Sequence, residues 1–212
     1  MKKFELTSEF ITNISGTKLF RIKALVEFGN IKAGELGGYI EKEENLDQDG
    51  DAWVYGNAKV YGNAKVYGDA KVCGDAKVHG NAEVCGDAWV CGNAKVYGDA
   101  KVYGDAKVHG NAEVCGDAEV YGDAWVYGDA WVYGDAKVCG DADYAYAHGF
   151  GSEYRTTTFF RLRNGDVGVR CGCFYGTLQE FRDKVRATHK ETKKAKEYLM
   201  LADLMELRFL KE

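Results

Sequence analysis

The sequence predicts an all-β solenoid in which the chain winds into coils of three six-residue units, or 18 residues, between two different ends. Three observations predict it. From Gly50 to Cys139 one unit, Gly-(Asp/Asn)-Ala-x-Val-y, occurs fifteen times without insertion or deletion. Glycine provides 27 of 212 residues while proline is absent, and at a period of 18 the side chains at x form ordered columns. Such a short fixed period is typical of a solenoid, because each unit buries its apolar face only against the next.

Within one unit, the positions of Ala and Val predict a short strand with an apolar inner side. Ala and Val are two residues apart, so both point to one side of a strand while x points to the other. Gly followed by Asp or Asn supplies a corner with positive φ. Only Lys, Glu and Trp occur at x, and only Tyr, Cys and His occur at y. We therefore expect Ala and Val to face inward and x and y to face outward.

A coil of 18 residues would stack equivalent positions about 4.8 Å apart. The x residues then form three columns, namely Trp53, Lys71, Trp89, Lys107, Trp125; Lys59, Lys77, Lys95, Glu113, Trp131; and Lys65, Glu83, Lys101, Glu119, Lys137. The third column alternates in charge, which avoids like-charge neighbours, and the first alternates Trp with Lys, which suits cation–π contacts. The second begins with a row of lysines, which is either a solvated edge or a track for anions.

The hexad Val-y-Gly-(Asp/Asn)-Ala-x resembles the bacterial hexapeptide repeat, in which a small residue follows an aliphatic one by four positions. This resemblance covers the repeated array and implies a left-handed parallel β-helix with three hexads per coil. The whole layout, with its Cys171-Gly172-Cys173-Phe174 segment near the far end, resembles hexapeptide-repeat proteins encoded by phages and prophages. The resemblance implies such a genomic setting, and an accessory role in the conflict between phage and host follows as a hypothesis.

We divide the chain into an N-terminal cap (residues 1–49), the hexapeptide-repeat β-helix (50–145) and a C-terminal module (146–212), because a solenoid needs caps over its exposed strand edges. The cap is expected to contain strands over residues 19–26 and 29–33 before the segment 36–40 leads into the first coil.

The C-terminal module is predicted to contain a β-hairpin and two helices. Segments 156–163 and 167–174 flank Asn164-Gly165-Asp166, a strong hairpin signal. Thr177 and Glu180 form a capping-box pattern at the start of a helix. A second helix, from about Lys193 to Leu210, is apolar over much of its surface and needs a partner surface. We therefore expect a homo-oligomer, a dimer or a trimer, with Leu199, Ala202 and Met205 at its interface.

Charge and cysteine content restrict the setting. The hexad array carries 8 basic and 13 acidic residues, and residues 140–212 carry 13 and 11, which makes nucleic acid an unexpected partner because a strongly basic face is missing. No apolar run is long enough to span a membrane, and no secretory core follows the start, so a cytoplasmic location in a bacterial host is expected. Cys73 and Cys91 would stack within disulfide distance, yet a reducing cytoplasm would keep them as thiols.

Catalysis, cofactors and metals are not expected. The acyltransferases of the hexapeptide-repeat superfamily, usually trimers, use a catalytic His and a loop that leaves the coils, and this array has no such loop. We expect His79 and His109 to be outward fillers of the columns at y. An unbroken acidic column could coordinate cations, but we expect each carboxylate to cap its own turn; its members are Asp51, Asp69, Asp87, Asp105, Asp123 and Asp141.

Seven of the eight arginines follow residue 145, and they suggest a ligand site. We select Arg161, Arg163 and Arg170 for phosphate, since guanidinium groups bind it in a bidentate manner, with Phe174 or Trp131 for stacking. The alternative is that these arginines line a solvated hairpin. Three functions stay open: a noncatalytic protein that sequesters a host factor or a small anionic, nucleotide-like signalling ligand and so inhibits host defence; a structural assembly module; and an acyltransferase.

Overall fold

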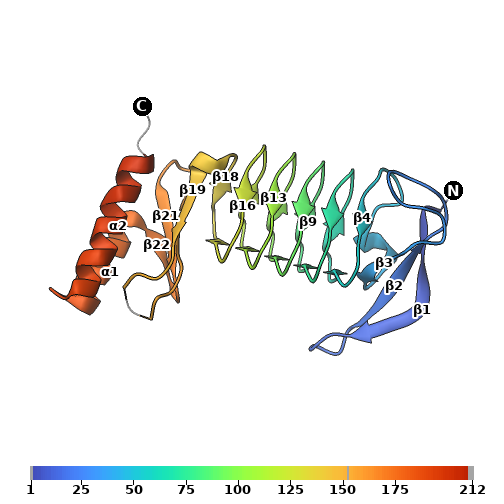
Figure 1. The fold of residues 1–212 in the computed structure, drawn as a ribbon, viewed down its shortest axis with the longest axis horizontal. Coiled ribbons are helices and arrows are strands. Elements are labelled where there is room, and N and C mark those ends of the chain that lie inside the picture. The colour runs from blue at the N-terminus through green and yellow to red at the C-terminus, as the bar shows by residue number, and fades with distance from the viewer. Residues whose placement is uncertain (1, 152, 210–212) are drawn as a thin grey trace.

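The computed structural model describes residues 2–151 and 153–209. The molecule is a rod with three parts along its length (Figure 1). Antiparallel strands form the N-terminal end, a stack of β-coils forms the middle, and a small antiparallel sheet covered by two helices forms the C-terminal end.

The middle of the molecule is a parallel β-solenoid with 18 residues per turn, as predicted. Each hexad contributes one two-residue strand, and Trp53 pairs with Lys71 while Lys59 pairs with Lys77. The strands fall into three columns, one for each side of the coil. Their bounds are β4 Trp53–Val54, β5 Lys59–Val60, β6 Lys65–Val66, β7 Lys71–Val72, β8 Lys77–Val78, β9 Glu83–Val84, β10 Trp89–Val90, β11 Lys95–Val96, β12 Lys101–Val102, β13 Lys107–Val108, β14 Glu113–Val114, β15 Glu119–Val120, β16 Trp125–Val126, β17 Trp131–Val132 and β18 Lys137–Val138.

The interior of the solenoid consists of the repeated Ala and Val side chains, all of them fully buried from Ala52 to Val138. The corners need glycine for two reasons, as Gly80 illustrates. Its φ is +74°, a conformation that costs other residues about 1–2 kcal/mol. A Cβ at Gly80 would also lie 3.0 Å from the backbone nitrogen of Gly98 in the next coil. The repeated glycine therefore allows both the turn and the close stacking of coils.

The Asn side chains at the corners bond to the next coil. The acidic column, whose carboxylates were expected to cap their own turns, also bonds between coils, because Asp69 Oδ1 accepts from the backbone nitrogen of Asp51 at 3.1 Å. Asn63 Nδ2 donates to Asn81 Oδ1 at 3.1 Å, and Asn81 Nδ2 donates to Asp99 Oδ1 at 2.9 Å. A second ladder runs from Asn93 through Asn111 to Asp129. Coil stacking places equivalent corner positions within reach of each other, so the Asn amides donate to the Asn or Asp of the next coil and connect the coils in ladders.

The predicted cation–π column is confirmed for its exposed members. The ammonium of Lys71 lies 5.2 Å from the ring centroid of Trp89, and that of Lys107 lies 4.5 Å from Trp125. Trp53 differs, because it is fully buried. The N-terminal cap covers it through Phe28, whose ring centroid is 5.3 Å away. The first x residue of the array is thus part of the core and not of the surface.

The N-terminal cap contains β1 (Phe4–Thr12), β2 (Lys18–Ala24), β3 (Leu36–Ile40) and the short 3-10 helix η1 (Glu43–Asn45). The strand predicted over residues 19–26 is essentially β2, but its partner is β1. The strand predicted over residues 29–33 is wrong, because this segment is a turn with one isolated bridge from Phe28 to Ile31. On its other edge β2 pairs with β3, and β3 joins the parallel sheet by pairing with β5.

The two ends of the solenoid need opposite kinds of cap. Every coil donates its strand N–H groups to the carbonyls of the next coil, as Lys59 does to Ala76, so carbonyl oxygens remain open at the N-terminal end. Lys3, only 3% exposed, donates from its ammonium to the carbonyls of Asp49, Gly50 and Ala52 at 3.2, 3.1 and 3.1 Å. A buried lysine thus caps the first coil.

N–H groups remain open at the C-terminal end, and side-chain oxygens accept from them. The backbone nitrogen of Trp125 donates to Asp141, that of Trp131 to Thr158 Oγ1, and that of Cys139 to Asp143, each at 3.0 Å. Asp141 and Asp143 belong to the 3-10 helix η2 (Asp141–Asp143). Burial alone would raise the pKa of Asp143, but hydrogen bonds from Cys139 and Arg161 outweigh it and lower the pKa.

The C-terminal sheet has the order β19 (Tyr144–Ala147), β20 (Thr157–Arg161), β21 (Val167–Cys171) and β22 (Phe174–Thr177). The predicted hairpin is confirmed as β20 and β21. β19 was not expected from the sequence, and it crosses the boundary drawn at residue 145.

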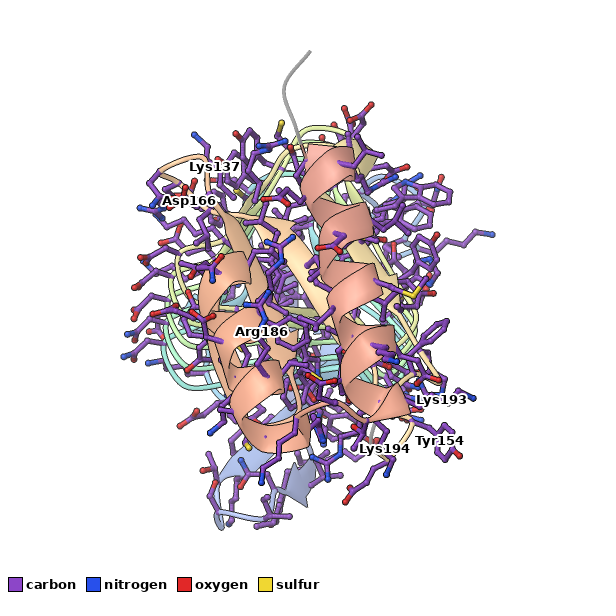
Figure 2. All side chains as sticks on the ribbon, turned by 90° about the vertical axis from the view of Figure 1, so that its left-hand side faces the viewer. Lys137, Tyr154, Asp166, Arg186, Lys193 and Lys194 are labelled. Carbon is purple, nitrogen blue, oxygen red and sulfur yellow. A yellow bond between two sulfur atoms is a disulfide. The ribbon has the colours of Figure 1, made fainter. Side chains whose placement is uncertain are left out.

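Helices α1 (Leu178–His189) and α2 (Lys193–Phe209) lie side by side across the end of the rod (Figure 2). The capping box of Thr177 and Glu180 is present at the start of α1. Leu210, the predicted last residue of the second helix, lies outside the described residues. No described helix combines the length and apolar character that crossing a membrane requires.

The inner face of α2 supplies a second core, and this corrects the expected interface. Ala202 is fully buried and Met205 is 7% exposed, because both pack onto α1 and the sheet, while Leu199 is only partly buried. The exposed apolar stripe of α2 consists instead of Met200, Leu204 and Leu207, which are 72%, 55% and 67% exposed. Self-association stays a prediction.

Candidate anion-binding site

Two of the three predicted phosphate-binding arginines form contacts within the protein. Arg161 Nε lies 3.1 Å from an oxygen of Asp143, and its Nη2 donates to the carbonyl of Phe209 at 3.2 Å. Arg163 Nη2 lies 3.0 Å from Glu119 Oε1 on the third side of the solenoid. These arginines fasten the hairpin to η2, α2 and the last coils, so the structure does not bring them into a common site with Arg170.

Arg170 and Trp131, in contrast, lie together where the last coils meet the C-terminal sheet. The Arg170 guanidinium is 4.8 Å from the Trp131 ring and 5.1 Å from the Tyr133 ring, and its Nε is buried with no hydrogen-bond partner among the described residues. They line a pocket of about 190 Å³, which we call the indole pocket; its lining residues are Asp129, Trp131, Arg155, Thr156, Thr158, Arg170 and Gly172.

Phe174 lies in a neighbouring pocket of about 170 Å³, which we call the phenyl pocket. Its walls come from the turn between β21 and β22, from α1 and from α2. Its lining residues are Arg155, Cys171, Cys173, Phe174, Phe181, Lys184, Val185, Thr188, His189 and Tyr198. The structure therefore places the two predicted stacking residues, Trp131 and Phe174, in separate but adjoining pockets.

Arg155 lines both pockets, and sequence reasoning missed it. Its side chain lies across Gly172, since a Cβ at Gly172 would be 2.7 Å from Arg155 Nη1. Gly172 has a φ of +57° in the two-residue turn between β21 and β22. Glycine is therefore favoured at position 172 because the turn has a positive φ and because the Arg155 side chain passes close to where a Cβ would be. The clustering of arginines after residue 145 indicated the region, but only the fold selects Arg155.

The backbone that leads to Arg155 is held in an unfavourable conformation. Glu153 and Tyr154 have φ values of 59° and 51°, although side chains other than glycine pay about 1–2 kcal/mol for this region. Figure 2 shows Tyr154 near the end at which α2 begins with Lys193 and Lys194. Strain of this kind often accompanies functional sites, and here it immediately precedes the residue common to both pockets.

The charge of the two pockets contrasts with that of the whole chain. Their lining includes the basic residues Arg155, Arg170 and Lys184 together with His189, and among the described lining residues only Asp129 is acidic, whereas the chain has a net charge of -5. Arg155 does form an ion pair with Glu153, but the two side chains are 53% and 69% exposed, and exposed pairs are worth about 0–1 kcal/mol. An anionic group can therefore compete for Arg155.

The two histidines of the array are packed against aromatic rings. His79 stacks between Tyr61 and Tyr97 at centroid distances of 4.8 and 5.1 Å, and burial together with Lys77 and Lys95 lowers the pKa of His79. His109 stacks on Tyr127 at 5.7 Å. Both therefore occupy the columns at y, as expected.

Neither the cysteines nor the carboxylates build a metal centre within the described residues. Cys73 and Cys91, on adjacent coils, are joined by a disulfide with a Cα–Cα distance of 4.6 Å. The predicted proximity is confirmed, and the expectation that both remain thiols is wrong in this structure, because stacking at an 18-residue interval puts the two sulfur atoms in direct contact.

Comparison with the models of known protein families and with curated proteins gave no match to this sequence. The resemblance to hexapeptide repeats is therefore supported by the structure at the level of the fold, a parallel β-solenoid with 18 residues per turn.

Proposed function

We propose that this chain is a noncatalytic binding protein that holds a small anionic ligand at the junction between the β-solenoid and the C-terminal module. The solenoid then serves as a rigid scaffold whose last coils supply one wall of the site. In this proposal the protein is an accessory factor of a phage or prophage and withdraws a small anionic signalling ligand from the host.

The observation that carries the proposal is the position of Arg155 between two concave pockets that contain three further basic or imidazole side chains. Guanidinium groups are the best protein ligands for phosphate and carboxylate oxygens. The Arg170 Nε, buried with no acceptor in the part of the chain that the structure describes, supports the same reading because an unpaired buried donor is costly. At about 190 and 170 Å³, each pocket is smaller than the 300–1,000 Å³ typical of drug-sized ligands, which favours a small ligand.

Isothermal titration calorimetry with inorganic phosphate and with the four ribonucleoside monophosphates tests the proposal. We expect at least one of them to bind wild-type protein, and Arg155→Gln to weaken that binding at least tenfold. Arg163→Gln is the matched control, because Arg163 is bonded to the solenoid at Glu119 and lies outside both pockets. Binding that is equally sensitive to both substitutions would contradict the proposal, as would the failure of all these compounds and of simple phosphate monoesters to bind.

A further inference from the structure

The phenyl pocket has an aromatic interior and a basic rim. Phe181 and Tyr198 are 3% and 4% exposed, and their rings meet edge to face with centroids 5.7 Å apart. The ring of Phe174 lies 5.5 Å from that of Phe181. Arg155 and Lys184, together with His189, complete the lining, which contains no carboxylate among its residues.

The volume of this pocket suits one six-membered ring. It measures about 170 Å³, and an apolar cavity of about 150 Å³ lined by aliphatic and aromatic side chains is sufficient to hold benzene. A ring of two fused cycles with a sugar attached would exceed this space. Aromatic rings pack favourably in offset or edge-to-face arrangements on such walls, so the pocket selects a flat, single ring.

We infer that the ligand of this site is a single-ring aryl anion, such as an aryl phosphate, whose ring enters the phenyl pocket and whose anionic group binds Arg155 at the boundary with the indole pocket. This inference rests on the proposed function and specifies its ligand class. The ring favours binding because its apolar surface is removed from water, and the anion favours binding because it accepts charge-assisted hydrogen bonds from the guanidinium. Arg170, which lines the indole pocket together with Arg155, adds positive charge there.

Calorimetric titration with three probes separates this inference from the proposed function. The probes are phenyl phosphate, 1-naphthyl phosphate and glycerol 3-phosphate, which share the phosphate monoester and differ in the attached group. We expect phenyl phosphate to bind at least tenfold more tightly than glycerol 3-phosphate, and also more tightly than 1-naphthyl phosphate. Arg155→Gln should weaken all three probes.

Phe174→Leu tests the ring contact alone, and it keeps an apolar side chain at a position that is only partly buried. We expect it to weaken phenyl phosphate at least threefold and to leave glycerol 3-phosphate unchanged. Equal affinities for phenyl and glycerol phosphates, or tighter binding of the naphthyl ester, would overturn the inference, while Arg155-dependent binding of any probe would still support the proposed function. If no probe bound, both would fail. Circular dichroism of each variant establishes that it is folded.

Discussion

Lys3 provides the sharpest test of how the solenoid begins, through the substitution Lys3→Met. Methionine retains the apolar stem but removes three hydrogen bonds to backbone carbonyls. The bond to Ala52 is fully buried, and those to Asp49 and Gly50 are partly buried. A hydrogen bond from a charged donor contributes about 1.5–3 kcal/mol, and an ordinary one about 0.5–1.5 kcal/mol. Burial also lowers the pKa of Lys3, so part of this gain is offset by the cost of burying the ammonium.

We therefore expect Lys3→Met to reduce the free energy of unfolding by about 3 kcal/mol, or Tm by about 6–12 °C for a chain of this length. Urea unfolding followed by circular dichroism measures the change. Lys2→Met is the control, because the ammonium of Lys2 is exposed and forms only a surface ion pair with Glu43, worth about 0–1 kcal/mol. If the two variants lost the same stability within about 0.5 kcal/mol, the capping role of Lys3 would be refuted.

Three further predictions concern the solenoid and its C-terminal end. Gly80→Ala should lower the free energy of unfolding by at least about 1 kcal/mol more than Gly16→Ala, because both glycines have positive φ but of the two only Gly80 lies against another coil. Equal losses of stability in urea would show that close stacking at Gly80 does not matter. Folding lowers the pKa of Asp143, so its contribution to stability is complete above the pKa of the unfolded state, about 3.9, and is lost as pH falls through the pKa of the folded state. Asp143→Asn should therefore flatten the fall in Tm between pH 5 and 3. An unchanged dependence of Tm on pH would argue against this linkage. Reduction of the Cys73–Cys91 disulfide, which links residues 18 apart in the sequence, should lower the free energy of unfolding by up to about 3 kcal/mol. The Tm of Cys73→Ser should not respond to dithiothreitol. If the Tm of the wild-type protein did not respond to dithiothreitol either, the disulfide would contribute nothing to stability.

The repeat allowed the middle of the fold to be predicted almost completely, because a six-residue period leaves few alternatives for stacking. The position of Trp53 could not be predicted in the same way. Its place in the repeat is identical to that of Trp89 and Trp125, and only the cap, which has no repeat, determines that Trp53 is buried. The strand expected over residues 29–33 failed for the same reason.

The candidate site was predicted only in part. Arginine content indicated the right module, and Arg170, Trp131 and Phe174 line the two pockets. Arg161 was misleading because alternation along a strand predicts the face of a side chain, but not the carboxylate that a later segment places beside it. Arg155 could not have been chosen from the sequence, since its role depends on how its loop crosses the turn at Gly172.

A crystal structure of the protein grown with phenyl phosphate would test the central claim most directly. We expect phosphate density within hydrogen-bond distance of the Arg155 guanidinium and a flat ring against Phe174 and Phe181. Density for the probe on the faces of the solenoid, with both pockets at the junction empty, would contradict it.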